Sequence, residues 1–332
     1  MSTKVGIAGA TGSVGQEVIK VLDAAPWRPD EIVPLARAAT TIPFVDYGGA
    51  QVAVDDLVHQ VWDELDLLIV ATPKDVAREA AGGAIDDGVL TVDCSGAFAD
   101  DDDVPLVVPW INPEKVQAAV EAGAVSVPSG PALLIASILG PLRRAAVDGA
   151  AAATVFVPAS IYGRHGIEEL SKQVVALFNS ATPPRKIFEN GLAFDLAPQL
   201  GVVDEFGRTA LESRVAAEVN TLVGMPIHRV TAVGVPVFSG MSAQLSIRAT
   251  RRVPAELVSQ ILADGGVIVA DDNSARSVPR PRSVEGHPFA HVGRIHVDHD
   301  GEIHIWCAID NLRATAAAAV ACGGALIKGV SM

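Results

Sequence analysis

Three glycines near the N-terminus have the spacing of a site that could bind a phosphate. Gly9, Gly12 and Gly15 follow a short apolar run and precede a segment whose apolar residues recur at helical spacing. A glycine-rich turn between a strand and a helix lets the backbone approach a pyrophosphate, and the first helical turn offers unpaired N–H groups. The pattern predicts a dinucleotide-binding loop; the alternative is a tight turn that binds nothing.

The residues after the second apolar run bear on the choice between NADP and NAD. An acidic side chain at the end of the second strand would bind the ribose hydroxyls of NAD. No acidic residue occurs between Leu35 and Thr41, whereas Arg37 and Thr40 offer a guanidinium and a hydroxyl to a 2′-phosphate. We therefore expect NADP, with NAD as the less favoured cofactor; the alternative for Arg37 is a plain surface arginine.

Cysteine and histidine side chains could support other chemistry. The cysteines at 94, 307 and 322 show no CxxC spacing, and we interpret them as reduced thiols of a cytoplasmic protein. Five of the eight histidines lie between residues 287 and 304. A metal is one interpretation, but two strands around the turn at 298–301 are the simpler one, and we predict no metal site.

Composition excludes some classes of partner. The 332 residues carry a net charge of −14, which disfavours nucleic acid because an acidic surface repels phosphates. No apolar run reaches the roughly 18 residues that a membrane span needs, so we expect no membrane partner. A chain that is 49% hydrophobic can bury a sizeable core, and its length predicts about two domains.

The order of the apolar segments predicts an α/β fold in two domains. Strands alternate with helices in the first part, which indicates a Rossmann-type, doubly wound parallel sheet, and a second α+β domain with antiparallel pairing follows. The expected strands lie at 4–8, 31–35, 65–71, 89–93, 106–108, 153–159, 228–237, 243–250, 293–297 and 302–309. The expected helices of the second part lie at 131–147, 166–179 and 211–223, and residues 270–287 are expected to form a loop.

Short motifs in order along nearly the whole chain resemble the aspartate-semialdehyde dehydrogenase family, and within it the Usg-type paralogues. They lie at residues 9–15, 95–98, 103–109 with Asn112, 166–170, 193–194, 235–240 and 310–313. The resemblance implies a dinucleotide-binding domain at 1–130, completed by the C-terminal helix 311–332, and a substrate and dimerisation domain at 131–310. It also implies a homodimer that interconverts an acyl phosphate and an aldehyde through a cysteine thioester, with NADPH as reductant and a histidine as acid/base.

The chain departs from the family at the positions that carry this chemistry. By the resemblance, the family's cysteine falls on Gly130, its glutamine on Val157, and its arginine and histidine on Gly234 and Met241. The phosphate-binding arginine falls on Ala99, which four aspartates follow. Without a thiolate and with an anion-repelling loop, we do not expect the family's own reaction. These losses indicate the Usg branch.

Four residues remain candidates for catalysis. Tyr162 replaces a small residue of the loop that faces the active site in the family, and His165 lies three residues later; either could give a proton to a carbonyl, or be only a packing tyrosine and an exposed histidine. Ser129 could be a nucleophile in a shifted register, or a helix cap. Arg214 keeps the basic member of the family's substrate-binding pair, and Glu212 could replace its acid.

The sequence therefore predicts an NADP-dependent oxidoreductase for a small-molecule carbonyl or imine substrate, with carboxylates among the candidates. The alternative is a catalytically inactive dinucleotide-binding or interaction protein. The resemblance adds Asn311, a cofactor-side position of the family, to the binding residues. The predicted cofactor-binding set is Gly9, Thr11, Gly12, Ser13, Val14, Arg37, Thr40, Thr72 and Asn311.

Overall fold

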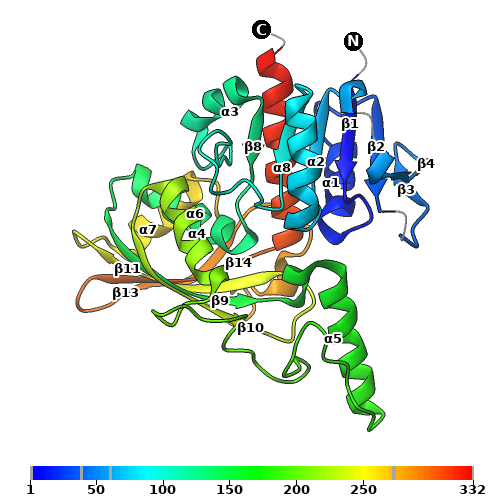
Figure 1. Cartoon of the computed structure of the whole chain (residues 1–332). Helices are drawn as coiled ribbons and strands as arrows, with labels where there is room; N and C mark the ends of the chain where they lie inside the picture. The colour runs from blue at the N-terminus through cyan, green and yellow to red at the C-terminus, as the bar shows by residue number, and fades with distance from the viewer. Residues whose placement is uncertain (1–2, 38–39, 60–61, 271–273, 331–332) are drawn as a thin grey trace. The chain divides into compact units, whose positions relative to one another are not determined.

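The computed structural model describes residues 3–37, 40–59, 62–270 and 274–330. The chain divides into two compact units, one of residues 1–129 with 315–332 and one of residues 130–314 (Figure 1). No helix in the described ranges combines the length and the hydrophobicity needed to cross a bilayer.

The first unit contains a six-stranded parallel sheet in the order β5-β2-β1-β6-β7-β8, which confirms the predicted Rossmann-type architecture. Its strands are β1 (Lys4–Ala8), β2 (Glu31–Ala36), β5 (Asp55–Asp56), β6 (Leu67–Val70), β7 (Leu90–Asp93) and β8 (Ala124–Ser126). The strand order reverses beside β1, which pairs with both β2 and β6. Ligands of such sheets bind at the carboxyl ends of the strands at this reversal.

Helices and short elements complete the first unit. They are α1 (Ser13–Asp23), α2 (Lys74–Asp86), α3 (Val116–Ala122), the hairpin of β3 (Phe44–Tyr47) and β4 (Ala50–Ala53), and the 3-10 turns η1 (Leu57–His59), η2 (Trp62–Glu64) and η3 (Pro113–Lys115). The last helix, α8 (Asn311–Val330), begins in the second unit and belongs to the first from Thr315 onward. Its Gly323 and Gly324 lie against Leu67 and Trp27, where a Cβ would collide, so these glycines allow the close approach.

The predicted strand at 106–108 is wrong. Leu106 makes only an isolated bridge to Ser126, and the edge strand of the sheet is the unpredicted β8. Asn112 holds the segment as a loop, because its side chain accepts from the Val108 amide at 2.8 Å and donates to the Leu106 carbonyl at 2.9 Å. The proline on each side of the run also limits its ladder pairing.

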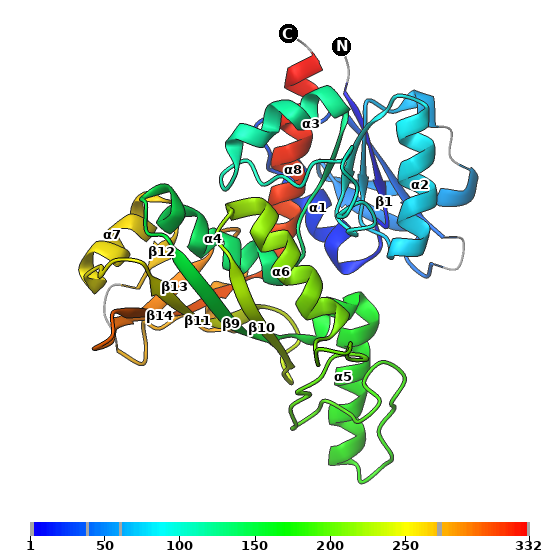
Figure 2. The same cartoon turned by 60° about the vertical axis from the view of Figure 1, so that its left-hand side comes forward.

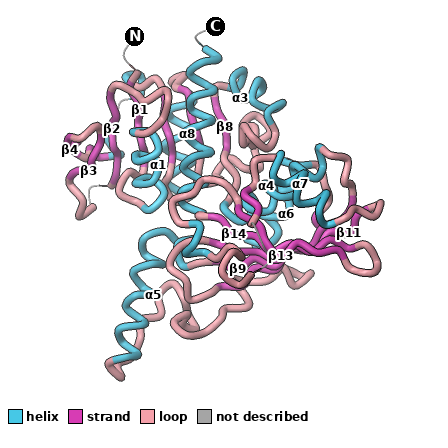
Figure 3. Tube along the Cα trace, turned by 180° about the vertical axis from the view of Figure 1, so that it is seen from behind, coloured by secondary structure: helices cyan, strands magenta, loops and turns pink. Residues whose placement is uncertain are grey.

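The second unit is built on a sheet in the order β10-β9-β11-β14-β13-β12. Its strands are β9 (Gly149–Val157), β10 (Ile227–Gly234), β11 (Met241–Ala249), β12 (Ile268–Val269), β13 (His291–Val297) and β14 (Glu302–Ile309). The hairpin of β13 and β14 is confirmed. The expected antiparallel pairing is confirmed between β9 and β11, β11 and β14, and β13 and β14, and the sheet is mixed because β10 runs parallel to β9 and β12 parallel to β13. Figure 3 shows the sheet from behind.

Helices α4 (Gly130–Arg144), α6 (Ala210–Val223) and α7 (Ala255–Asp264) cover one face of this sheet, and α5 (Gly163–Phe178) extends away from it (Figure 2). A 3-10 turn, η4 (Ala159–Tyr162), leads into α5. The segment predicted as a loop at 270–287 includes residues 271–273, which lie outside the described ranges. Its described part carries the 3-10 turn η5 (Pro281–Val284) and is tied to β14 by a 2.7 Å bond from the Trp306 indole to the Pro279 carbonyl.

Candidate cofactor site and active centre

The glycine turn after β1 has a backbone that side chains would obstruct. Gly9 has a φ of +86°, and a Cβ there would lie 2.5 Å from the Ala71 carbonyl oxygen. A Cβ on Gly15 would collide with the Gly9 carbonyl. The Gly9 and Ala10 amides donate to the Leu35 carbonyl at 2.8 and 3.1 Å, which fixes the turn at the carboxyl end of β2. The glycines thus leave space for a ligand, called the cradle below, at the carboxyl ends of the strands.

The first turn of α1 presents donors at this cradle. Gly12 is the N-cap, it supplies no side-chain cap, and the first turn contains no acidic residue. The amides of Ser13 and Val14, which come next in the helix, therefore have no intrahelical acceptor, and the positive end of the helix dipole lies at the same place. Thr11 directly precedes the cap. This arrangement suits a pyrophosphate.

Thr72 supplies a separate indication of a ligand. It follows β6, and a Cβ on Gly9 would lie 3.1 Å from its methyl group. Its hydroxyl oxygen is buried without a hydrogen-bond partner in the described part of the chain. Buried polar atoms without partners are rare and costly, so a polar ligand beside the glycine turn would satisfy this one. The residues present therefore fit a dinucleotide.

Arg37 and Thr40 lie together beyond the end of β2. The Thr40 amide donates to the Arg37 carbonyl at 2.9 Å, and the Ile42 amide donates to the Thr40 hydroxyl at 3.3 Å. The Arg37 guanidinium is 4.0 Å from the Asp75 carboxylate, and the two side chains are 60% and 81% exposed. An ion pair this long and this exposed contributes little, so Arg37 can turn to a phosphate at small cost.

In the second unit, Gly130, Met241 and Asn311 meet. A Cβ on Gly130 would lie 3.3 Å from the Asn311 Cβ and 3.8 Å from the Met241 methyl group. The buried Asn311 side chain accepts from the Gly240 amide at 3.0 Å and donates to the Ser160 hydroxyl at 3.0 Å. Asn311 therefore holds this centre together by hydrogen bonds within its own unit. The side chain of Gly130 is a hydrogen and that of Met241 is a thioether. Neither can transfer a proton or attack a carbonyl.

Tyr162 and His165 lie at the junction of η4 and α5. Backbone bonds from Ala159 to Val237 (2.8 Å) and from Ser160 to Phe238 (2.9 Å) tie η4 to the loop before Met241. The Tyr162 ring packs edge-to-face with that of Phe188, with ring centroids 5.5 Å apart, and the residue remains 42% exposed. Burial raises the pKa of the Tyr162 phenol, which therefore stays protonated at neutral pH. His165 is exposed in the first turn of α5.

The remaining predicted site residues have structural partners. Arg214 donates to the buried carboxylate of Glu218 at 2.7 Å. Both carboxylate oxygens of Glu212 accept backbone amides, from Thr209 at 2.8 Å and Ala232 at 2.9 Å. Glu212 thus completes a capping box on α6, a Thr-x-x-Glu pattern that the sequence contains and that sequence analysis missed. Ser129 directly precedes α4 and is half-buried.

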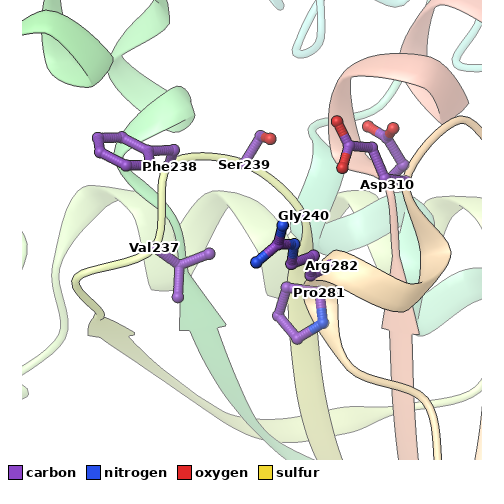
Figure 4. A pocket seen from close by; sticks show the side chains of 8 residues that line it. Val237, Phe238, Ser239, Gly240, Pro281, Arg282 and Asp310 are labelled. Carbon is purple, nitrogen blue, oxygen red and sulfur yellow. The ribbon is translucent and has the colours of Figure 1, made fainter. Parts of the chain in front are cut away.

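A pocket of about 290 Å³ opens next to the loop before Met241 (Figure 4). Its lining consists of Val237, Phe238, Ser239, Gly240, Pro281, Arg282, Glu285 and Asp310. Asp310 accepts from the Gly286 amide at 2.8 Å, whereas no ion pair joins Arg282 to an acid in the part of the chain that the structure describes. The pocket therefore offers a guanidinium that an anionic group could bind. Arg282 is not among the site residues predicted from the sequence, because it lies in a segment interpreted only as a loop.

The three cysteines are poor nucleophiles. Burial raises the pKa of Cys94 well above its ordinary value, raises that of Cys322 to about 12, and raises that of Cys307 as well. Cys307 and Cys322 are buried, and each contacts a backbone carbonyl. Since the thiolate is the reactive form, these side chains are unreactive at neutral pH.

Comparisons with known proteins extend over almost the whole chain. The model of the semialdehyde dehydrogenase NAD-binding domain matches residues 4–119, and that of the semialdehyde dehydrogenase dimerisation domain matches residues 139–314. Aspartate-semialdehyde dehydrogenase of Aquifex aeolicus is 30% identical over 324 residues, 96% of this chain and 95% of that protein. A USG-1 protein homolog of Azotobacter vinelandii is 29% identical over 93% of each chain. The crystal structure of Vibrio cholerae aspartate semialdehyde dehydrogenase II complexed with ASA aligns over 99% of each chain, with a TM-score of 0.91 and 26% identity.

Proposed function

The chain belongs to the aspartate-semialdehyde dehydrogenase family, and on that premise we propose that it is an NADP-dependent oxidoreductase that works without the family's cysteine nucleophile. Its substrate is then a carbonyl or imine compound other than the family's acyl phosphate. The observation that carries the proposal is the meeting of Gly130 and Met241 in one centre of the second unit, together with a glycine turn in the first unit whose backbone suits a pyrophosphate.

The cofactor part of the proposal is supported by four groups. The first-turn amides of Ser13 and Val14 would hold the pyrophosphate, and the Thr72 hydroxyl would gain the partner that it lacks. Arg37, paired only weakly with Asp75, would bind the 2′-phosphate. When bound, the nicotinamide supplies a hydride.

The protein must then supply a proton and an orienting charge. Tyr162 is a protonated phenol with an exposed face, and it is tied through η4 to the loop that lines the pocket. Its hydroxyl would donate to the substrate oxygen or nitrogen as the hydride arrives, with the exposed His165 as the second donor. Arg282 would hold a substrate carboxylate in the pocket.

Turnover of NADPH with a panel of aldehydes, 2-keto acids and cyclic imines tests this function. With any substrate that reacts, Tyr162→Phe is expected to lower kcat by about 10²- to 10⁴-fold, the range for losing a general acid, and to leave NADPH affinity unchanged. The matched variant His165→Gln shows whether the neighbouring donor contributes. Tyr162→Phe at wild-type rate would exclude the phenol as proton donor.

An inactive dinucleotide-binding protein is the second candidate function. The same centre favours it, because the side chains of positions 130 and 241 include no ionisable group. The exposed aspartates 100–103 also directly follow the position at which the family binds phosphate, and their negative charge would repel a phosphate there. NADPH binding without turnover of any substrate in the panel would support this candidate over the first.

The preference for NADPH over NADH is expected to depend on Arg37. Removing a hydrogen bond to a charged group costs about 1.5–3 kcal/mol, so Arg37→Ala should weaken NADPH by roughly 10- to 100-fold. NADH lacks the 2′-phosphate and serves as the internal control, since its affinity should not change. Calorimetric titration of both nucleotides into both proteins measures this. Equal affinities of the wild-type chain for NADPH and NADH would refute the assignment of Arg37.

A homodimer is the assembly that we propose, in keeping with the dimerisation-domain match over residues 139–314. Phe178 at the end of α5 and Phe194 form an edge-to-face pair with ring centroids 5.7 Å apart, although they are 78% and 67% exposed. Exposed aromatic pairs of this kind suit a protein interface. Sedimentation equilibrium should give twice the 34.3 kDa chain mass; a monomer would contradict the assembly.

A further inference from the structure

The β13–β14 hairpin carries an unusual density of side chains that bind metals. Six of the nine residues at 296–304 are histidine, aspartate or glutamate. Asp298, Glu302 and His304 each place one ligand atom so that all three atoms lie within 4.8 Å of one another, and all three residues are half-buried. The hairpin without a metal was the simpler interpretation of the sequence; the side-chain geometry adds information that the sequence lacked.

The imidazole of His304 is held with one nitrogen toward the carboxylates. Its Nδ1 is 2.9 Å from the Ser246 hydroxyl on β11, which leaves Nε2 facing Asp298 Oδ2 at 3.5 Å. That distance is longer than a good N–H···O bond. It is close to the roughly 3.4 Å that separates two ligands of a tetrahedral ion with bonds of about 2.1 Å.

The carboxylate of Asp298 is oriented in the same way. Its Oδ1 accepts the backbone amides of Asp300 at 3.0 Å and Glu302 at 2.8 Å, so Oδ2 is the oxygen directed at His304. Both ligands thus use one polar atom to hold their orientation and present the other. Such supporting hydrogen bonds are typical of the groups that position metal ligands.

Glu302 can complete the set at little cost. Its carboxylate is 3.9 Å from Arg248, whose side chain is 83% exposed, so the pair is weak and readily released. His296 lies opposite His304 in the strand register, and the two rings stack with centroids 4.7 Å apart. A water would take the fourth position of a three-ligand site.

We propose that Asp298, Glu302 and His304 form a site for a divalent ion of the zinc class. One nitrogen and two oxygen donors are of the types that zinc accepts, and the 3.5 Å between His304 Nε2 and Asp298 Oδ2 suits two ligands of one ion. The site lies at the opposite end of the β11–β14 pairing from Met241, because Arg248 pairs with Glu302 whereas Met241 pairs with Ile309. The ion would therefore tie the turn of the hairpin to β14 and take no part in the chemistry of the active centre.

Metal binding by the untagged full-length chain, stripped with a chelator and dialysed, tests the site. Zinc competition against a chromophoric chelator should give one equivalent per chain, and cobalt should give the absorption bands of a tetrahedral ion. His304→Gln and Glu302→Gln should lose this binding, and Ser246→Ala should weaken it roughly 10- to 100-fold. The matched control is His228→Gln, which removes an exposed histidine on β10.

Two further measurements keep the outcome clear. The metal-free variants should remain folded, with at most the small loss of stability that a missing hydrogen bond causes, and NADPH affinity should be unchanged by zinc. Retained stoichiometric binding in His304→Gln, or equal loss in His228→Gln, would overturn the assignment. So would a wild-type chain that binds no zinc or cobalt.

Discussion

The Gly12→Asp variant is expected to bind neither NADPH nor NADH at concentrations that saturate the wild-type chain. Aspartate is a preferred N-cap, and the backbone at this position, with φ −78° and ψ 167°, accepts it, so the variant should fold. Its carboxylate would accept the first-turn amides itself and repel the pyrophosphate. Losing two charge-assisted hydrogen bonds costs about 3–6 kcal/mol, or roughly 10²- to 10⁴-fold in affinity.

Calorimetric titration measures the effect of Gly12→Asp, and two variants control for its causes. Gly12→Ala adds bulk without charge, at a position where a Cβ would lie 3.2 Å from the Gly9 carbonyl oxygen. Gly82→Asp adds the same charge on α2, where a Cβ would meet no atom within 4 Å, and should bind as the wild-type chain does. Unchanged nucleotide affinity in a folded Gly12→Asp variant would refute the placement of the cofactor.

Reduction of aspartyl phosphate is expected to be undetectable. Removing the nucleophile of a covalent mechanism lowers kcat on the order of 10⁶-fold, and Gly130 provides no atom that could replace it. In the proposed register the family's acid/base position falls on Met241, which lies at the same centre as Gly130. The nucleophile and the acid/base group work together in the family's reaction. Restoring only one of them, at position 130 or at position 241, should therefore not restore activity.

An assay in parallel with an active family member measures this second prediction. Cys94→Ser is the informative variant, because Cys94 is the half-buried thiol, whereas Cys307 and Cys322 are fully buried. Any aspartyl-phosphate reduction by the wild-type chain that Cys94→Ser abolishes would show that a thiolate attacks after all. That result would contradict both the register of Gly130 and the proposed change of substrate.

The elements predicted well are those that local sequence determines. The turn at Gly9 and the helix after it follow from glycine spacing and an apolar stripe within one short segment. The hairpin of β13 and β14 follows from two apolar runs around an Asp-Gly turn. By contrast, β8 has three residues and is stabilised by pairing with β7, and the parallel pairing of β9 with β10 depends on the connection across α5 and α6. Neither is visible in a local pattern.

The candidate site likewise contains a part that local sequence predicts and a part that depends on contacts between distant segments. The glycine turn was predicted because its conformation depends on glycine spacing within one short segment, and the donors proposed for the cofactor are backbone amides of that segment. The part played by Asn311 could not be predicted, because its partners Gly240 and Ser160 are 71 and 151 residues away in the chain. Arg282 was missed because only the folded loop brings it next to Val237. Side-chain pockets assembled from distant loops require tertiary contacts that composition does not reveal.

A crystal of the chain soaked with NADPH tests the central claim most directly. We expect the pyrophosphate within hydrogen-bond distance of the Ser13 and Val14 amides, with the 2′-phosphate at Arg37. A glycine turn that holds only water at saturating NADPH, or a nucleotide bound elsewhere on the chain, would contradict it.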